Sequence, residues 1–169
     1  LICVAQTYRY LGVEDGLSNR RVYCIQKDKT GYMWFLTHEG IDRYNGKEFK
    51  RYKLMDGDAE VNSLLNLNWL YIDQEGVLWE IGKKGKVFRY DQIHDCFSLV
   101  YKLPMESFSE QPDPVTYAWL DQNKHIWLCN KDTIFLYNTD TKQVTHIKND
   151  ISEEITDIEQ IDESHFFIG

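Results

Sequence analysis

The chain has 169 residues, of which 43% are hydrophobic and 14% aromatic, and its formal net charge is −8. This length and apolar content are sufficient for a domain with a buried core, and the acidic balance argues against a nucleic-acid partner, which would require a basic surface. The sequence contains no apolar run near the roughly 18 residues that a membrane span requires.

The first residues are apolar and do not begin with Met. We interpret residues 1–5 as the remnant of a signal peptide, with Cys3 and Ala5 as the small residues before the cut. An ordinary first strand is the alternative interpretation. A lipoprotein anchor is less favoured, because bulky Ile2 stands where a small residue is required. Residues 6–21 then form a lead-in strand and loop.

A motif in which Asp is followed six residues later by Trp recurs along the chain. The pairs are Asp28 and Trp34, Asp73 and Trp79, Asp121 and Trp127, and a degenerate copy with Asp162 and Ile168. The last positions of successive pairs are 45, 48 and 41 residues apart. A drifting period in the forties, in sequence rich in β-formers, is typical of propeller blades. We therefore predict an all-β protein with the β-propeller fold and about three and a half four-stranded blades in this sequence.

Each repeat divides into short segments of β-forming residues. We predict strands at 22–27, 32–37, 41–44 and 48–54, then at 67–72, 77–82, 86–90 and 96–102, then at 115–120, 125–129, 133–137 and 143–148, and finally at 156–161 and 165–168. The corresponding blades are 22–54, 67–103, 115–149 and the start of a fourth at 155–169, all within one propeller domain. Residues 55–66 and 104–114 are predicted as long loops, with at most one helical turn at 59–65.

The first strand of each repeat carries apolar groups on both faces, as expected for a strand buried between neighbouring blades. We expect the Asp residues to accept backbone N–H groups in the turn that follows this strand, rather than to act in catalysis or metal binding. The Trp residues are interpreted as blade packing rather than as a ligand platform. Because propellers close with about four to eight blades, we expect a longer, seven-bladed propeller. Residues 6–169 alone should aggregate or form oligomers.

The first repeat carries an extended version of the motif. It comprises Gly16-Leu17-Ser18, Val22, Asp28, Gly31, Trp34, Thr37, Gly40, Ile41, Arg43 and Tyr44-Asn45-Gly46. This pattern closely resembles the two-component regulator propeller repeat, which builds the periplasmic sensor region of hybrid two-component systems in Bacteroides-type bacteria. The chain departs from the pattern at Leu36, where Gly is usual, and at Lys124 and His165, which replace Gly31 and Gly76 of the earlier turns.

The resemblance implies a periplasmic module in a protein that continues through further blades, an immunoglobulin-like domain, one membrane helix and cytoplasmic kinase and DNA-binding parts. It implies an oligosaccharide ligand released from glycans, whose binding controls polysaccharide-utilisation genes. It also implies a homodimer, with no nucleic-acid contact from this segment and no catalysis in it, although the full protein would be a sensor histidine kinase.

The residues themselves point to no reaction, no cofactor and no metal. The five His residues are scattered, without nucleophile–base spacing. The four Cys residues have no metal-like spacing and are interpreted as small core residues or unpaired thiols. Residues 56–58 and 138–140 faintly resemble calcium loops but lack the other ligands. The sialidase Asp-box is discounted because Gln26, Tyr71, Trp119 and Gln160 stand where it requires Ser or Thr.

Long irregular loops on a rigid scaffold are where binding sites usually lie. In an up-and-down blade, the connection between blades and the turn between the second and third strands share one face. Candidate ligand-binding residues on this face are Arg20, Arg21, His38, Glu39, Asn62, Asn66, Lys83, Lys84, Phe108, Asn130 and Lys131. Phe108 could stack on a pyranose ring, and the alternative is that all of these are solvated loop residues. A secreted glycoside hydrolase or lyase, or a protein-interaction propeller, remains the alternative function.

Overall fold

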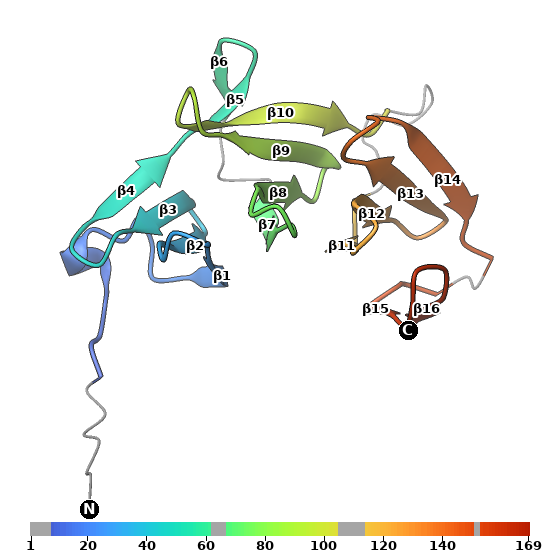
Figure 1. Ribbon diagram of the computed structural model, residues 1–169, viewed down its shortest axis with the longest axis horizontal. Helices are drawn as coiled ribbons and strands as arrows, with labels where there is room; N and C mark the ends of the chain where they lie inside the picture. Colours follow the sequence, from blue (N-terminus) through green and yellow to red (C-terminus); the bar gives the residue numbers. More distant parts are fainter. Residues whose placement is uncertain (1–7, 62–66, 105–113, 151–152) are drawn as a thin grey trace, which may run out of the picture.

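The computed structural model describes residues 8–61, 67–104, 114–150 and 153–169. Its strands form sheets that stand side by side in an arc (Figure 1). In each of the first three repeats, four strands follow one another in chain order and pair antiparallel, with the first strand on the inside of the arc and the fourth on the outside. The predicted all-β fold of propeller blades is confirmed.

Strand bounds lie close to those predicted from the sequence. Blade 1 contains β1 (Val22–Lys27), β2 (Met33–Thr37), β3 (Gly40–Tyr44) and β4 (Phe49–Tyr52). Blade 2 contains β7 (Leu67–Ile72), β8 (Leu78–Gly82), β9 (Lys86–Asp91) and β10 (Cys96–Lys102). Blade 3 contains β11 (Tyr117–Leu120), β12 (His125–Cys129), β13 (Thr133–Asn138) and β14 (Val144–Lys148). The fourth repeat provides β15 (Ile158–Gln160) and β16 (Phe166–Ile168), and a 3-10 turn, η1 (Val13–Asp15), precedes blade 1.

Two further strands form a hairpin that the sequence analysis did not predict. The strand expected at 48–54 ends at Tyr52, and β5 (Leu54–Asp56) and β6 (Ala59–Val61) follow it. The helical turn expected at 59–65 is wrong in its described part, because Ala59–Val61 is extended. β5 pairs in parallel with the outer strand β10, so the sheet of blade 2 has six strands. This pairing satisfies backbone groups at the edge of β10 and buries Leu54, which is 2% exposed.

The recurring Asp residues lie in the turn between the first and second strands of each blade. Trp34 donates its indole N–H to Asp28 at 2.8 Å, and the same bond joins Trp79 to Asp73 at 2.8 Å and Trp127 to Asp121 at 2.9 Å. The other carboxylate oxygen accepts backbone N–H groups of the turn, for example those of residues 30 and 32 in blade 1. One carboxylate therefore fixes the turn and the rotamer of the Trp together.

Each Trp side chain packs into the seam between its own blade and the next. Trp34, Leu36 and Ile41 of blade 1 pack with Leu70, Leu78, Phe88 and Phe97 of blade 2. Trp79, Ile81 and Val87 of blade 2 pack with Ala118, Ile126 and Leu128 of blade 3. Trp127 packs in the same way with Ile155 and Ile158 of the fourth repeat. The core of the molecule is thus a series of seams between sheets.

Hydrogen bonds also join successive blades along both the turns and the inner strands. In the turns, Lys29 Nζ donates to the carbonyl of Gln74 at 2.5 Å, Gln74 donates to Gln122 at 3.3 Å, and Asn123 donates to Glu163 at 2.7 Å. On the inner strands, Gln26 donates to the carbonyl of Leu70 at 3.0 Å and Tyr71 donates to that of Ala118 at 2.6 Å. Residues one repeat apart in sequence are therefore neighbours in space.

The first turn of blade 3 keeps a left-handed residue although the sequence has no Gly there, whereas His165 of the fourth repeat does not have a positive φ. Gly31 and Gly76 have φ of 94° and 90°, and Lys124 occupies the corresponding position with φ of 65°. A side chain in this conformation costs free energy. Lys124 forms an ion pair with Glu75 across the seam at 2.5 Å and one with Asp140 of its own blade at 3.0 Å, and both offset part of that cost.

Candidate functional site

The Gly-Leu-Ser segment before blade 1 clamps the chain onto the outside of that blade. Gly16 has φ of 106°, a conformation that favours glycine, and Leu17 is buried. Ser18 then donates its backbone N–H and its hydroxyl to the two carboxylate oxygens of Asp42, at 2.9 and 2.5 Å. Burial raises the pKa of Asp42, and the two bonds from Ser18 oppose this shift. The motif that carried the resemblance thus acts here as a structural clamp.

The predicted ligand residues of blade 1 lie together at one end of the sheet. His38 and Glu39 form the turn between β2 and β3, and the His38 backbone N–H donates to the carbonyl of Arg21 at 3.0 Å. The His38 ring contacts the hydroxyl of Tyr23 at 2.9 Å, and Glu39 forms an ion pair with Arg51 at 4.0 Å. Arg20 is exposed beside this group.

The predicted residues of blades 2 and 3 occupy the corresponding turns. Lys83 and Lys84 are exposed in the β8–β9 turn, and the Lys83 carbonyl accepts the N–H of Val115 at 2.7 Å. Asn130 caps the β12–β13 turn by accepting two backbone N–H groups, and the carbonyl of Lys131 accepts a bond from Asn149. In the described residues, Lys83, Lys84 and Lys131 form no ion pair. Asn62, Asn66 and Phe108 lie outside the described residues.

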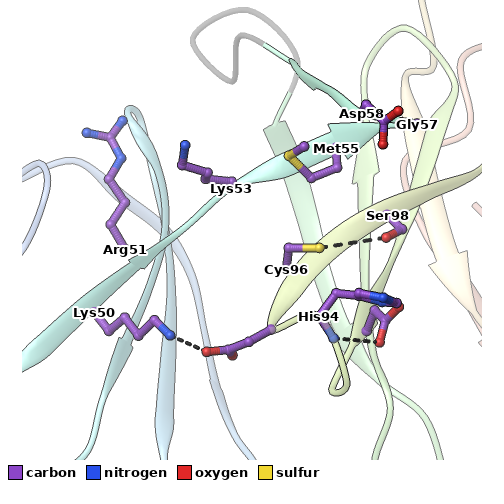
Figure 2. A pocket seen from close by; sticks show the side chains of 11 residues that line it. Lys50, Arg51, Lys53, Met55, Gly57, Asp58, His94, Cys96 and Ser98 are labelled. Carbon is purple, nitrogen blue, oxygen red and sulfur yellow. Dashed lines mark hydrogen bonds and ion pairs between the residues drawn. The ribbon is translucent and has the colours of Figure 1, made fainter.

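A pocket of about 730 Å³ lies on the outer rim between blades 1 and 2 (Figure 2). One wall is formed by β4, β5 and the turn after β5, and the other by the β9–β10 turn and the start of β10. The lining residues are Lys50, Arg51, Lys53, Met55, Gly57, Asp58, Asp91, His94, Asp95, Cys96 and Ser98. The volume lies in the range usual for small-ligand sites.

The two carboxylates of the β9–β10 turn in this pocket are held in their charged form. Lys50 of blade 1 forms an ion pair with Asp95 of blade 2, and Tyr90 donates its hydroxyl to the same carboxylate at 2.7 Å. These bonds, that from Lys50 first, lower the pKa of Asp95 to about 2. The His94 ring, 2.6 Å from Asp91, lowers the pKa of Asp91. A glycosidase requires a carboxyl group whose pKa is raised, so these two residues suit binding rather than acid catalysis.

The cations of the pocket wall are paired, but with exposed partners. Lys53 contacts Glu60 at 2.7 Å, and Arg51 contacts Glu39. Exposed ion pairs contribute only about 0.2–1 kcal/mol, so a ligand can replace such partners at little cost. Figure 2 shows Arg51 and Lys53 on one wall and Cys96 and Ser98 on the other. The Cys96 thiol lies 3.8 Å from the Ser98 hydroxyl.

Sequence reasoning did not identify this pocket or its residues. Lys50 and Asp95 are 45 residues apart, which is the spacing of Trp34 and Trp79 in the recurring motif. Polar residues separated by one repeat period were therefore a usable signal. Of the predicted ligand residues that the structure describes, none lines the rim pocket or the two pockets beside the turns between first and second strands.

Antiparallel four-stranded sheets, packed face to face and each fixed by an Asp–Trp pair, define the chain as a segment of a β-propeller. Residues 16–39 match the family model described as two component regulator propeller. This match confirms the resemblance seen in the sequence and includes the Ser18 clamp, Asp28 and Trp34. No curated protein matches the chain.

Two solved structures from B. thetaiotaomicron are similar to the chain. The extracellular domain of the putative hybrid two component system BT3049 superposes with a TM-score of 0.73 and 27% identity, over 95% of this chain and 23% of that one. The extracellular domain of the putative hybrid two component system BT4673 gives a TM-score of 0.71 and 20% identity, over 95% of this chain and 21% of that one, and supports the fold alone. The chain thus spans less than a quarter of either structure. Among the described residues, no helix is long and apolar enough to cross a membrane.

Proposed function

We propose that this chain belongs to the ligand-sensing propeller of a periplasmic hybrid two-component regulator. The carrying observation is that a two-component regulator propeller repeat and a likeness to the BT3049 extracellular domain at 27% identity occur in the same chain. In this proposal the ligand is a glycan-derived oligosaccharide, and binding signals across the membrane, through a sensor kinase in the full protein, to polysaccharide-utilisation genes. The full protein acts as a homodimer.

We propose the face formed by the second-to-third-strand turns as the ligand surface. Of its described residues, Glu39 and Asn130 are half-buried and the others are exposed. Backbone hydrogen bonds, such as that from His38 to Arg21, fix the turns on which they lie. Lys83 and Lys84 suit this role best, because they are exposed cations without a carboxylate partner in the described residues. The rim pocket is the alternative location for the ligand site, and it is tested by substituting Arg51 and His94, which line it.

The test is calorimetric titration of the full-length sensor region with a panel of neutral and acidic oligosaccharides. Replacing Lys83 and Lys84 by Ala should weaken binding of the recognised saccharide by at least about tenfold, the equivalent of about 1.4 kcal/mol, without lowering the melting temperature. Lys47→Ala, an exposed Lys on the opposite turns, serves as the matched control. Loss of affinity in Arg51→Ala and His94→Ala instead would move the site to the rim pocket.

The same titrations separate this function from its alternatives. Saccharide turnover, detected as new reducing or unsaturated ends, would show that the protein is a hydrolase or lyase rather than a sensor. Absence of binding to every saccharide, together with capture of a specific protein, would favour an interaction propeller. A sensor should bind without turnover, and its saccharide should change autophosphorylation of the full-length protein.

A further inference from the structure

Glu80 is a fully buried acid in the middle of β8. The residue is 0% exposed, and among the described residues neither carboxylate oxygen has a partner with hydrogen-bond geometry. Buried polar groups without partners are rare in folded proteins, and a buried charge without a partner is costlier still. Glu80 therefore requires an explanation that blade packing alone does not provide.

The surroundings of Glu80 are apolar and belong to the seam between blades 1 and 2. Across the sheet, Glu80 is paired with Leu70 of β7 and Phe88 of β9, each 1% exposed. Its face of β8 also carries Leu78, which packs against Trp34, Leu36 and Ile41 of blade 1. The residue that follows the Trp is Phe35 in blade 1 and Leu128 in blade 3. Only blade 2, among these three, places an acid at this position.

The charged and titratable groups of this seam come from several elements. Within its apolar core they are Cys24 of β1, Tyr32, Arg43 of β3, Tyr52 of β4 and Tyr90 of β9, and the parts of β2, β5, β6, β7 and β10 that pack there are apolar. At its edges lie Asp28, which accepts from Trp34, and the Lys50–Asp95 ion pair. Arg43 is held by the Tyr32, Trp34 and Tyr52 rings, at 4.5, 5.4 and 5.2 Å from their centroids. None of these groups shifts the Glu80 pKa, which burial raises well above its ordinary value against a weaker effect of the Asn68 backbone N–H.

We propose that Glu80 makes the seam between blades 1 and 2 a proton-linked contact, closed while the carboxyl is protonated and loosened when it ionises. A neutral carboxyl can remain between Leu70 and Phe88 at moderate cost. A carboxylate is far less stable there, because only the Asn68 backbone N–H opposes the cost of burial and no cation among the described residues does, so ionisation favours blades that admit water. The inference concerns this contact and does not depend on the sensory role.

The pH range of the effect follows from the two states of the seam. Below about pH 4.5, Glu80 is protonated in both the closed and the open state, and it contributes no pH dependence. Above that value the open state releases its proton first, so rising pH favours opening. The effect grows until the pH reaches the pKa of the closed state and is constant beyond it.

The experiment is amide hydrogen exchange of the full-length protein between pH 4.5 and 8.5, comparing wild type with Glu80→Gln and Glu80→Leu. Amides of β12 provide the internal reference and exposed Glu48→Gln the control variant. For β7 and β8, the opening constant of wild type relative to either Glu80 variant should rise about tenfold per pH unit before reaching a plateau. The Glu48→Gln protein should follow wild type throughout.

A ratio that stays constant over this pH range would overturn the proposal. Failure of both Glu80→Gln and Glu80→Leu to fold would also overturn it, because a carboxyl that only links the seam to protons is dispensable for folding. Folding of Glu80→Leu alone, with exchange in β7 and β8 that no longer depends on pH relative to β12, would support it.

Discussion

The seams on the two sides of blade 2 have the same strand order and the same Asp–Trp hydrogen bond, but their side-chain contacts differ. Between blades 1 and 2, the Trp34 ring contacts three aromatic rings, those of Tyr52, Tyr90 and Phe97, with centroids at 4.8, 5.1 and 5.9 Å. The Trp34 ring also contacts one cation, Arg43 at 5.4 Å, whereas Trp79, between blades 2 and 3, contacts two, Arg89 at 5.9 Å and Lys142 at 5.7 Å from the ring centroid.

The two seams also differ in the charge of one residue in the turn between the third and fourth strands. In the third-to-fourth-strand turn, blade 2 has Asp95 and blade 3 has Lys142, and both residues are left-handed, with φ of 51° and 63°. Asp95 forms an ion pair with the preceding blade, whereas Lys142 packs over Trp79 and is held at a lowered pKa by burial and by Arg89. The Asp–Trp bond and the turn geometry thus define a blade, while the seam chemistry varies around them.

Truncation of Trp34 and Trp79 should give the largest difference in stability loss between the two seams. Trp34→Ala and Trp79→Ala each remove a buried ring, which typically costs about 3–5 kcal/mol. The loss at Trp34 should be the greater, because edge and tilted ring contacts add about 0.5–1.5 kcal/mol beyond area. Denaturant unfolding of the full-length sensor region measures both, and Trp34→Phe separates the ring from its N–H bond to Asp28. Equal losses at Trp34 and Trp79 would contradict the difference inferred here.

The inner-strand hydrogen bonds should give a smaller difference. Tyr71→Phe leaves the Ala118 carbonyl without its side-chain donor and should cost about 0.5–1.5 kcal/mol. Gln26→Ala should cost less, because the Cys24 thiol also donates to the Leu70 carbonyl, at 3.4 Å. Thermal unfolding of the two variants gives the order, and the double change of Gln26 and Cys24 to Ala should approach the loss at Tyr71. A larger effect of Gln26→Ala alone would show that the thiol does not compensate.

The Lys50–Asp95 ion pair should give the smallest difference. The pKa of Asp95 is lowered to about 2 from an ordinary value of 3.8. Its contribution is therefore present above about pH 4 and is lost as the pH falls toward 2. Asp95→Asn keeps a residue type that tolerates a left-handed backbone, and should cost about 0.2–1 kcal/mol at pH 7, as exposed pairs do. Stability curves from pH 2 to 7 should converge for wild type and variant at the acid end. A gap as large at pH 2 as at pH 7 would assign the effect to packing instead.

The blades could be predicted because their determinants are local. Asp28 and Trp34 lie within one hairpin, so their spacing appears directly in the sequence. The β5–β6 hairpin could not be predicted, because β5 is short and pairs with β10, more than 40 residues away. The rim pocket was missed for the same reason, since its walls come from two repeats. Glu80 was missed because one acid in an apolar strand gives no periodic signal, and only packing reveals its burial.

Because β5 follows blade 1 in the sequence but pairs with β10 of blade 2, the sequence repeat and the structural blade do not have the same boundaries. A duplication or exchange bounded by successive Trp codons would transfer β5 together with blade 1 and separate it from the strand that it covers. The recipient blade would then expose the bare edge of β10. A boundary at Lys53, between β4 and β5, would keep the hairpin with its own sheet. Shuffling of such blades should therefore be tolerated at that residue and penalised a few positions later.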